Sequence, residues 1–288
     1  MIKRNYYYLV AYLPDLFSDE KKPPFSSVEF RNILRGELSK TDFESSELLF
    51  LPYDHKNLLN LLFKKDKKWD DRGNYDKETL DKVADHKSYE LAEDLSLKPY
   101  LNEFLEQFYG EVGFDNYYTA ELNLTAKYYD YLSENPSSFL KKIVENEKNI
   151  RNVNTTLTGR KHNLKFEDTL IGDDEITAAL KKSRVRDFGL SDEVEGIENV
   201  VQIFEIQNPV DREYKLDQYI WNYLDEITFF NYFSIEKILA YIKKLFIAER
   251  WYELDKETGR NLFKKILKEL QAGFKIPEEF TIIHGKKK

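Results

Sequence analysis

The 288-residue sequence contains no cysteine and no long apolar segment. The lack of cysteine excludes disulfides, thiolate metal sites and a cysteine nucleophile, and it fits a reducing compartment such as the cytosol. No apolar run approaches the roughly 20 residues that cross a bilayer. The run at 6–13 is too short for a signal peptide, and no cleavage site follows it. We therefore expect a folded cytoplasmic protein that reaches a membrane only through a partner.

Basic residues are outnumbered by acidic ones. The chain has 52 Asp and Glu against 44 Lys and Arg, a formal charge of −8 with histidine neutral. This balance argues against nucleic acid as a partner, because phosphate binding needs a concentrated basic surface. Hydrophobic residues make up 41% of the chain, which is enough for a core. Charged residues make up 33%, which is too many for an integral membrane protein. Aromatic residues, at 15%, predict a large core or a core with an adhesive face.

Apolar residues recur at every third or fourth position over much of the chain, which is typical of amphipathic helices. This spacing predicts one helix within 210–230 and a second that Ser234 caps. A third helix is expected after Asp255, with a stop at Gly273 and Pro277. Further helices are predicted in four upstream segments, which are 101–108, 117–132, 176–180 and 191–204. The predicted fold class is all-α.

Two kinds of segment depart from this helical pattern. The short apolar runs 6–13 and 48–51 are each closed by a proline, and any strand is limited to them as a minor element. Residues 64–87 contain many charged and few apolar side chains, which predicts an exposed charged loop.

Three segments share a pattern of an acidic or polar residue, a lysine and a branched apolar residue. They are Asp54–Leu58, Glu147–Ile150 and Glu236–Leu239, each expected to open a helix that ends in basic residues. Their spacing of roughly 90 residues is too long for a solenoid. It favours one body of three similar helical modules, approximately 1–98, 99–190 and 191–288, around a pseudo-threefold axis. Such strings also occur on ordinary amphipathic helices, and the pattern alone does not choose between the two interpretations.

Catalytic signatures are absent from the sequence. It has no phosphate-binding glycine loop, no dinucleotide-binding glycine motif and no nucleophile elbow around serine. His86 and Glu90 are the only histidine–carboxylate pair at helical spacing, and a surface ion pair explains them without a metal. The acidic run 173–175 suits the beginning of a helix. We predict that the chain is not an enzyme and binds no cofactor or metal.

Clustered aromatic residues and one basic segment exceed what a simple helical domain needs. The aromatic clusters lie at 6–8, 117–118, 128–129 and 229–233. Adjacent aromatic residues on a helix cannot all face one core, so either some lie at an interface or the bundle is thick. The basic segment 181–186 is interpreted either as a solvated helix end or as a contact for an acidic partner.

The sequence resembles the C-type (d-type) central-stalk subunit of V-type and A-type rotary ATPases. The resemblance is carried by residues 6–13, 54–59 and 236–242. The stretches 159–163 and 183–190 are more closely similar to a bacterial family of uncharacterised proteins encoded beside V-type ATPase genes. Pro14 with Asp15, and the charged stretch 64–87, depart from the family pattern and affect the geometry of the first module.

The resemblance implies a funnel of three helical modules that forms a socket between the central stalk and the membrane rotor ring. The partners would be the stalk and ring subunits of a V-type ATPase or ATP synthase that transports protons or sodium ions. The protein would then be cytoplasmic and peripheral to the inner face of the cell membrane, through the complex. The residues expected to contact the stalk or ring are basic and aromatic, namely Lys56, Arg160, Lys161, Arg184, Arg186, Phe230 and Tyr232.

Each of these residues also has a structural interpretation. Phe230 and Tyr232 would then belong to the core, and Arg184 and Arg186 would pair with nearby carboxylates at Asp187, Asp192 and Glu193. The alternative function is a free-standing helical scaffold or adaptor unrelated to rotary ATPases. An enzyme is a more distant alternative, which would need a buried cluster of ionisable residues in a deep pocket.

Overall fold

The structure, a computed structural model, describes residues 4–17, 22–86 and 96–254. In the first half of the chain the helices are α1 Tyr7–Ala11, α2 Ser27–Glu37, α3 Lys40–Glu47, η1 Leu48–Phe50, α4 Leu51–Leu62, α5 Lys77–Ala84, α7 Pro99–Tyr109 and α8 Tyr117–Ser133. In the second half they are α9 Ser138–His162, η2 Glu167–Thr169, α10 Glu175–Lys182, α11 Ile197–Phe204, α12 Pro209–Ile227 and α13 Ile235–Glu253. The described chain is all-α and contains no strand, which confirms the predicted fold class.

The two apolar runs that left room for a strand are helical. Residues 7–11 of the first run form α1, and residues 48–50 of the second form the 3-10 turn that leads into α4. Pro52 does not close that run but lies in the first turn of α4. A proline is tolerated there because the backbone N–H it lacks would have no partner within the helix.

Local capping chemistry explains where several helices begin. Ser26 forms a capping box with Glu29 at α2, and Asp174 accepts a hydrogen bond from the N–H of Thr177 at α10. Ser234 precedes α13 as predicted, but its side chain makes no capping hydrogen bond. The third C-terminal helix expected after Asp255 lies outside the described residues.

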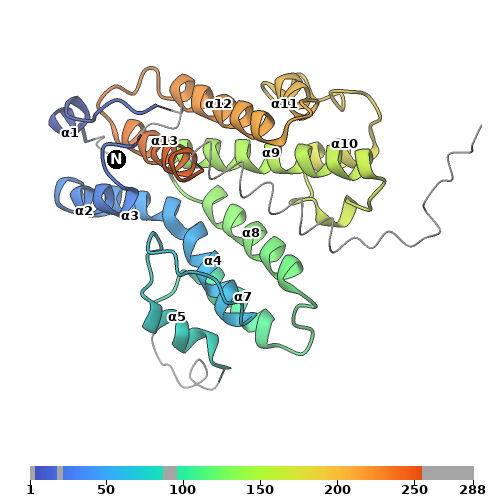
Figure 1. The fold of residues 1–288 in the computed structure, drawn as a ribbon, viewed down its shortest axis with the longest axis horizontal. Helices are drawn as coiled ribbons and strands as arrows, with labels where there is room; N and C mark the ends of the chain where they lie inside the picture. The colour runs from blue at the N-terminus through green and yellow to red at the C-terminus, as the bar shows by residue number, and fades with distance from the viewer. Residues whose placement is uncertain (1–3, 18–21, 87–95, 255–288) are drawn as a thin grey trace, which may run out of the picture.

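In Figure 1, α9 and α11–α13 form the upper part of the molecule, and α4, α5, α7 and α8 form the lower part. One core joins buried residues of α2–α4 and α7–α9 to α13, and a second core lies among α9–α12. α9 takes part in both, with Val144 in the first core and Val153 in the second. Leu34, Leu124 and Ile242, one from each predicted module, share the first core. The pseudo-threefold arrangement of the modules stays a prediction.

The segment 64–87 is only partly the exposed charged loop that its composition predicts. Residues 64–68 are exposed, but the strap formed by residues 69–76 packs on α2 and α4, and α5 follows it. Arg31 donates hydrogen bonds to the carbonyls of Arg72 and Gly73, at 3.0 and 2.8 Å. Asn57 binds both the carbonyl and the N–H of Asp70, at 2.8 and 3.0 Å. Residues 69–76 are therefore packed against the protein despite their few apolar side chains, because hydrogen bonds from Arg31 and Asn57 hold them.

Among the described residues, no helix combines the length and the apolar character that a membrane crossing needs. Glu90 of the predicted His86–Glu90 pair and Lys87, the last residue of the predicted loop, lie outside the described residues.

Candidate functional site

Three neighbouring hollows lie among α4, α8, α9, α12 and α13 and are together called the central trench here. Their volumes are about 730, 800 and 470 Å³. The first and second hollows share Tyr118, and the second and third share Lys56. The first and third share Glu147 and Ile220. The shared residues place the three hollows next to one another.

The three helices that carry the sequence repeat all line the trench. Lys56 comes from α4, Glu147 from α9 and Lys243 from α13. The repeat at Glu236 opens α13 as predicted, but Glu147 lies well inside α9, which begins at Ser138. Three helices that each carry one of the similar segments thus line one depression, although α13 does so through Lys243 and later residues rather than through 236–239.

Ion pairs close the floor of the trench. Lys243 of α13 pairs with Glu147 of α9, and both side chains are mostly buried. Arg250 pairs with Asp217 of α12 and lies 3.0 Å from Glu213. These pairs tie α13 to α9 and α12, so the floor is held by charges that already have partners.

The α4 side of the trench is organised by the strap. Lys56 lies 3.9 Å from Asp70, and Arg72 lies 2.7 Å from the same carboxylate. The Arg72 guanidinium is also 4.1 Å from the centre of the Tyr53 ring. Burial alone would raise the pKa of Asp70, but the hydrogen bond and charge of Arg72 lower it below its usual value. Lys56 keeps 57% of its side chain exposed and is therefore accessible to a partner.

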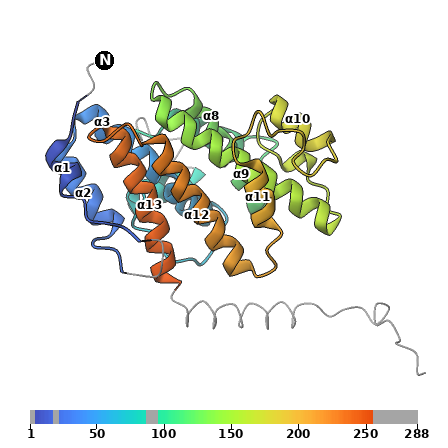
Figure 2. The same ribbon diagram turned by 90° about the horizontal axis from the view of Figure 1, so that it is seen from above.

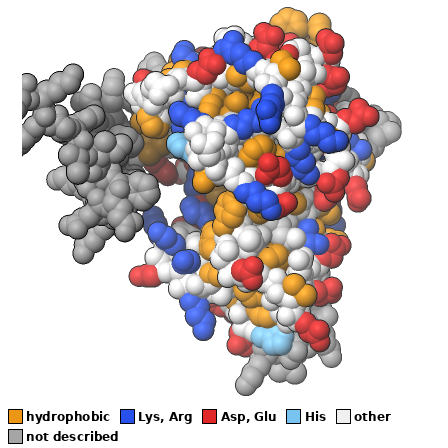
Figure 3. All heavy atoms as spheres, turned by 90° about the vertical axis from the view of Figure 1, so that its right-hand side faces the viewer, with side chains coloured by type: hydrophobic (Ala, Val, Ile, Leu, Met, Phe, Trp, Pro, Cys, Tyr) orange, Lys and Arg blue, Asp and Glu red, His pale blue; other side chains and the backbone are white. Residues whose placement is uncertain are grey.

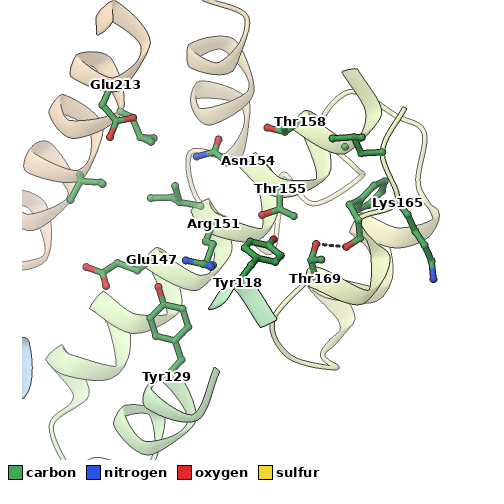
Figure 4. A pocket seen from close by; sticks show the side chains of 16 residues that line it. Tyr118, Tyr129, Glu147, Arg151, Asn154, Thr155, Thr158, Lys165, Thr169 and Glu213 are labelled. Carbon is green, nitrogen blue, oxygen red and sulfur yellow. Dashed lines mark hydrogen bonds between the residues drawn. The ribbon is translucent and has the colours of Figure 1, made fainter. Parts of the chain in front are cut away.

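The first hollow, of about 730 Å³, lies between α8, α9, the 164–169 segment and α12 (Figure 4). Its polar lining on α9 consists of Glu147, Arg151, Asn154, Thr155 and Thr158. Arg151 makes no ion pair with any carboxylate in the described part of the chain, unlike the floor residues. Nearby, burial and the charge of Glu147 raise the pKa of Tyr129, which stays a neutral phenol.

The lining of the trench is less acidic than the chain as a whole. Its cationic residues are Lys56, Lys65, Lys67, Arg72, Arg151, Lys165, Lys243 and Arg250. Its anionic residues are Glu121, Glu147, Glu213, Asp217 and Glu253. Basic residues thus predominate here in a chain whose formal charge is −8. The trench is suited to a partner that presents acidic and apolar side chains together.

The seven predicted contact residues do not form one site. Lys56 lines the trench, whereas Arg160 has a structural role at the far end of α9. Its guanidinium donates to the carbonyls of Leu180 and Ser183, at 2.9 and 2.5 Å, and lies 4.8 Å from the Phe188 ring centre. Arg160 thereby satisfies carbonyl groups at the end of α10.

Three more of the predicted residues lie at the same end of the molecule as Arg160. Figure 3 shows many Lys and Arg side chains over the upper part of this face, mixed with acidic ones. Lys161 is exposed and 5.7 Å from the Phe204 ring centre. Arg186 binds Glu205 through two hydrogen bonds at 3.2 and 2.8 Å, and not the carboxylates close to it in sequence. Arg184 is exposed and has no ion pair within the described residues.

The two predicted aromatic residues are on the surface. Phe230 is 85% exposed and Tyr232 is 60% exposed, in the loop between α12 and α13. The interpretation that placed them in the core is therefore wrong, because the loop turns outward where α12 ends.

Sequence reasoning missed Arg151 and Lys243. Only the repeat at Glu147 signalled that this part of α9 belongs to a site, and Arg151 follows it by one helical turn. The described residues contain no group of three or more His, Asp or Glu side chains able to hold a metal.

The described part of the chain is therefore an all-helical protein with a charged trench and an exposed aromatic loop. The chain belongs to a protein family of unknown function, DUF2764, whose model matches residues 3–274. Searches found no matching curated protein and no matching solved structure.

Proposed function

We propose that the chain is a non-catalytic assembly component whose central trench receives a helical partner protein. The observation that carries this proposal is the convergence of Lys56, Glu147 and Lys243, one from each repeat-bearing helix, on a single depression. The partner would present acidic and apolar side chains, matching a lining that is more basic than the rest of the chain.

The specific proposal is a central-stalk or rotor component of a V-type ATPase or ATP synthase. It rests on the sequence resemblance, and the trench would be the socket for the stalk. Through the ring subunits, the protein would be peripheral to the inner face of the membrane and would contribute to proton or sodium ion transport. A free-standing helical scaffold or adaptor would use the same trench for another helical protein.

Co-purification with V-type ATPase subunits tests the proposal. Stalk and ring subunits from the same organism would be reconstituted with wild type and with a Lys56→Glu/Arg151→Glu variant, at two ionic strengths. We expect the variant to bind at least about tenfold more weakly at low salt, with a smaller difference at high salt, because salt screens the lost attraction.

A Lys77→Glu/Lys141→Glu variant is the matched control, because both lysines are exposed, carry the same charges and lie outside the trench. It should bind as wild type does. Equal binding of the trench variant and wild type would refute the role of the trench. Failure of the wild-type protein to bind either set of subunits would refute the rotary ATPase assignment and favour the adaptor.

A further inference from the structure

A second surface lies at the end of the molecule where α1 meets the α12–α13 loop (Figures 1 and 2). It consists of exposed aromatic side chains from these two segments and is here called the aromatic surface. Its members, with their exposed fractions, are Tyr7 54%, Tyr8 83%, Phe229 61%, Phe230 85%, Tyr232 60% and Phe233 39%. Tyr12, also 83% exposed, follows at the end of α1.

The aromatic surface is held in place by contacts between its two segments. The N–H of Tyr6 donates to the carbonyl of Phe233 at 2.6 Å, and the rings of Tyr7 and Phe233 are 4.8 Å apart. Phe229 packs edge-on against Phe230 with ring centres 5.0 Å apart. The hydroxyl of buried Tyr6 binds Asp42 and so anchors α1 to α3. A partner would therefore meet a largely formed surface, with little ordering to oppose binding.

The area of the aromatic surface is large for a free monomer. Its members together expose the equivalent of about four complete aromatic residues, on the order of 600–900 Å². The largest apolar patch on an ordinary monomer covers about 300–600 Å². A standard protein–protein interface buries about 800 Å² on each partner. The aromatic surface is thus large enough for one such interface.

The absence of charge points to the identity of the occupant. No charged residue occurs at 5–14 or at 227–234, although a third of the chain is charged. Homodimer interfaces are more apolar than other interfaces, and their cores are depleted of charge. A chain of charge −8 is repelled by the anionic cytoplasmic leaflet, which disfavours a lipid surface. Two copies of the chain would therefore meet through segments that carry no charge of their own.

We propose that the aromatic surface binds the aromatic surface of a second copy of this chain. The two copies would be related by a twofold axis, so that each aromatic surface packs against its equivalent. Offset and edge-on packing of aromatic rings suits such a self-complementary contact. The inference does not rest on the function proposed for the trench, which lies among different helices.

Sedimentation velocity tests the proposal between about 1 and 100 µM. Wild type should be dimeric at the higher concentrations. A Phe229→Ser/Phe230→Ser variant should dimerise at least about 100-fold more weakly, because buried aromatic residues dominate interface energies. The exposed Val112, at 91% exposure, provides the control variant Val112→Ser, which should dimerise as wild type does. Circular dichroism would verify that each variant keeps its helices.

The absence of cysteine allows a direct distance measurement. A single spin label at Tyr8→Cys should give one short label-to-label distance in the dimer, whereas a label at Val112→Cys should give a longer one. Wild type that is monomeric at 100 µM would overturn the proposal. So would a serine variant that dimerises like wild type, or aromatic-dependent binding to uncharged phosphatidylcholine vesicles without dimer formation.

Discussion

The hydroxyl of Tyr100 on α7 lies 2.6 Å from Nε2 of His55 on α4, and both side chains are buried. The His55 ring also meets the ring of Tyr128 edge-on, with centres 5.2 Å apart. Burial lowers the pKa of His55 from 6.5 to about 3, so the imidazole is neutral in the folded protein. His55 is therefore a buried titratable group that takes up a proton only on unfolding.

Stability should consequently depend on pH through His55. Its contribution is complete above pH 6.5 and is lost as the pH falls toward 3, because only the unfolded chain then binds the proton. The expected slope is at most about 1.4 kcal/mol per pH unit. Urea unfolding of wild type and His55→Phe between pH 7 and 4 measures it. Asp54 contributes in the opposite direction, since burial raises its pKa to about 6, but it is present in both proteins and cancels.

The variant should show a smaller loss of stability on acidification than wild type, although its absolute stability falls because Tyr100 loses a partner. His162→Gln, at an exposed position, serves as the control and should keep the wild-type slope. Identical slopes in His55→Phe and wild type would contradict the assignment.

The strap depends on one amide side chain. Asn57 is 2% exposed and binds both backbone groups of Asp70. Asn57→Ala should lower the free energy of unfolding by about 2–4 kcal/mol, because two backbone groups lose their partner. Hydrogen exchange at residues 69–75 should also become faster. Asn60→Ala, on the same helix and half-buried, should cost less than about 1 kcal/mol, and an equal loss in both variants would rule out a specific role for Asn57.

Substitution of Arg160 should lower the stability of the protein, whereas substitution of Arg184 should not. Removing the Arg160 guanidinium leaves the carbonyls of Leu180 and Ser183 without their donor and removes its contact with the Phe188 ring. Arg160→Ala should lower thermal stability by the equivalent of about 2–4 kcal/mol. Arg160→Lys should restore less than half of it, because an ammonium cannot replace the planar fork. Thermal denaturation of Arg184→Ala should match wild type within about 0.5 kcal/mol, and a larger shift there would contradict its exposed, unpaired position.

Two glycines should respond oppositely to alanine. A Cβ at Gly159 of α9 would lie 2.5 Å from Cδ1 of Phe166, whereas a Cβ at Gly36 of α2 would meet nothing within 4 Å. Gly159→Ala should therefore destabilise the protein by about 1–3 kcal/mol, through displacement of a packed ring. Gly36→Ala should stabilise it by about 0.5–1 kcal/mol, because alanine favours the helix. Denaturant unfolding of both variants checks the signs, and a stabilised Gly159→Ala protein would show that the ring can move freely.

Much of the helical structure could be predicted because its causes are local. The predicted segments 117–132 and 210–230 correspond closely to α8 and α12. Each helix has a single apolar face and a capping asparagine at its start, Asn116 or Asn208. The beginning of α9 was missed, because this helix contributes to two cores and has no single apolar stripe. The strap was missed because side-chain hydrogen bonds from α2 and α4, rather than apolar residues, hold it.

The sequence by itself determined the helical class, the acidic balance, the absence of thiol chemistry and the existence of aromatic clusters. These follow from composition and from spacing within a few turns. Only the tertiary structure decided which clusters are buried and which are exposed, since Tyr128 lies in the core while Phe230 does not. It also decided that Lys56, Glu147 and Lys243 share a depression, whereas Arg160 and Arg186 are used within the fold. The physical reason is that helix packing, set by contacts between residues far apart in the chain, selects the neighbours and solvent exposure of each side chain.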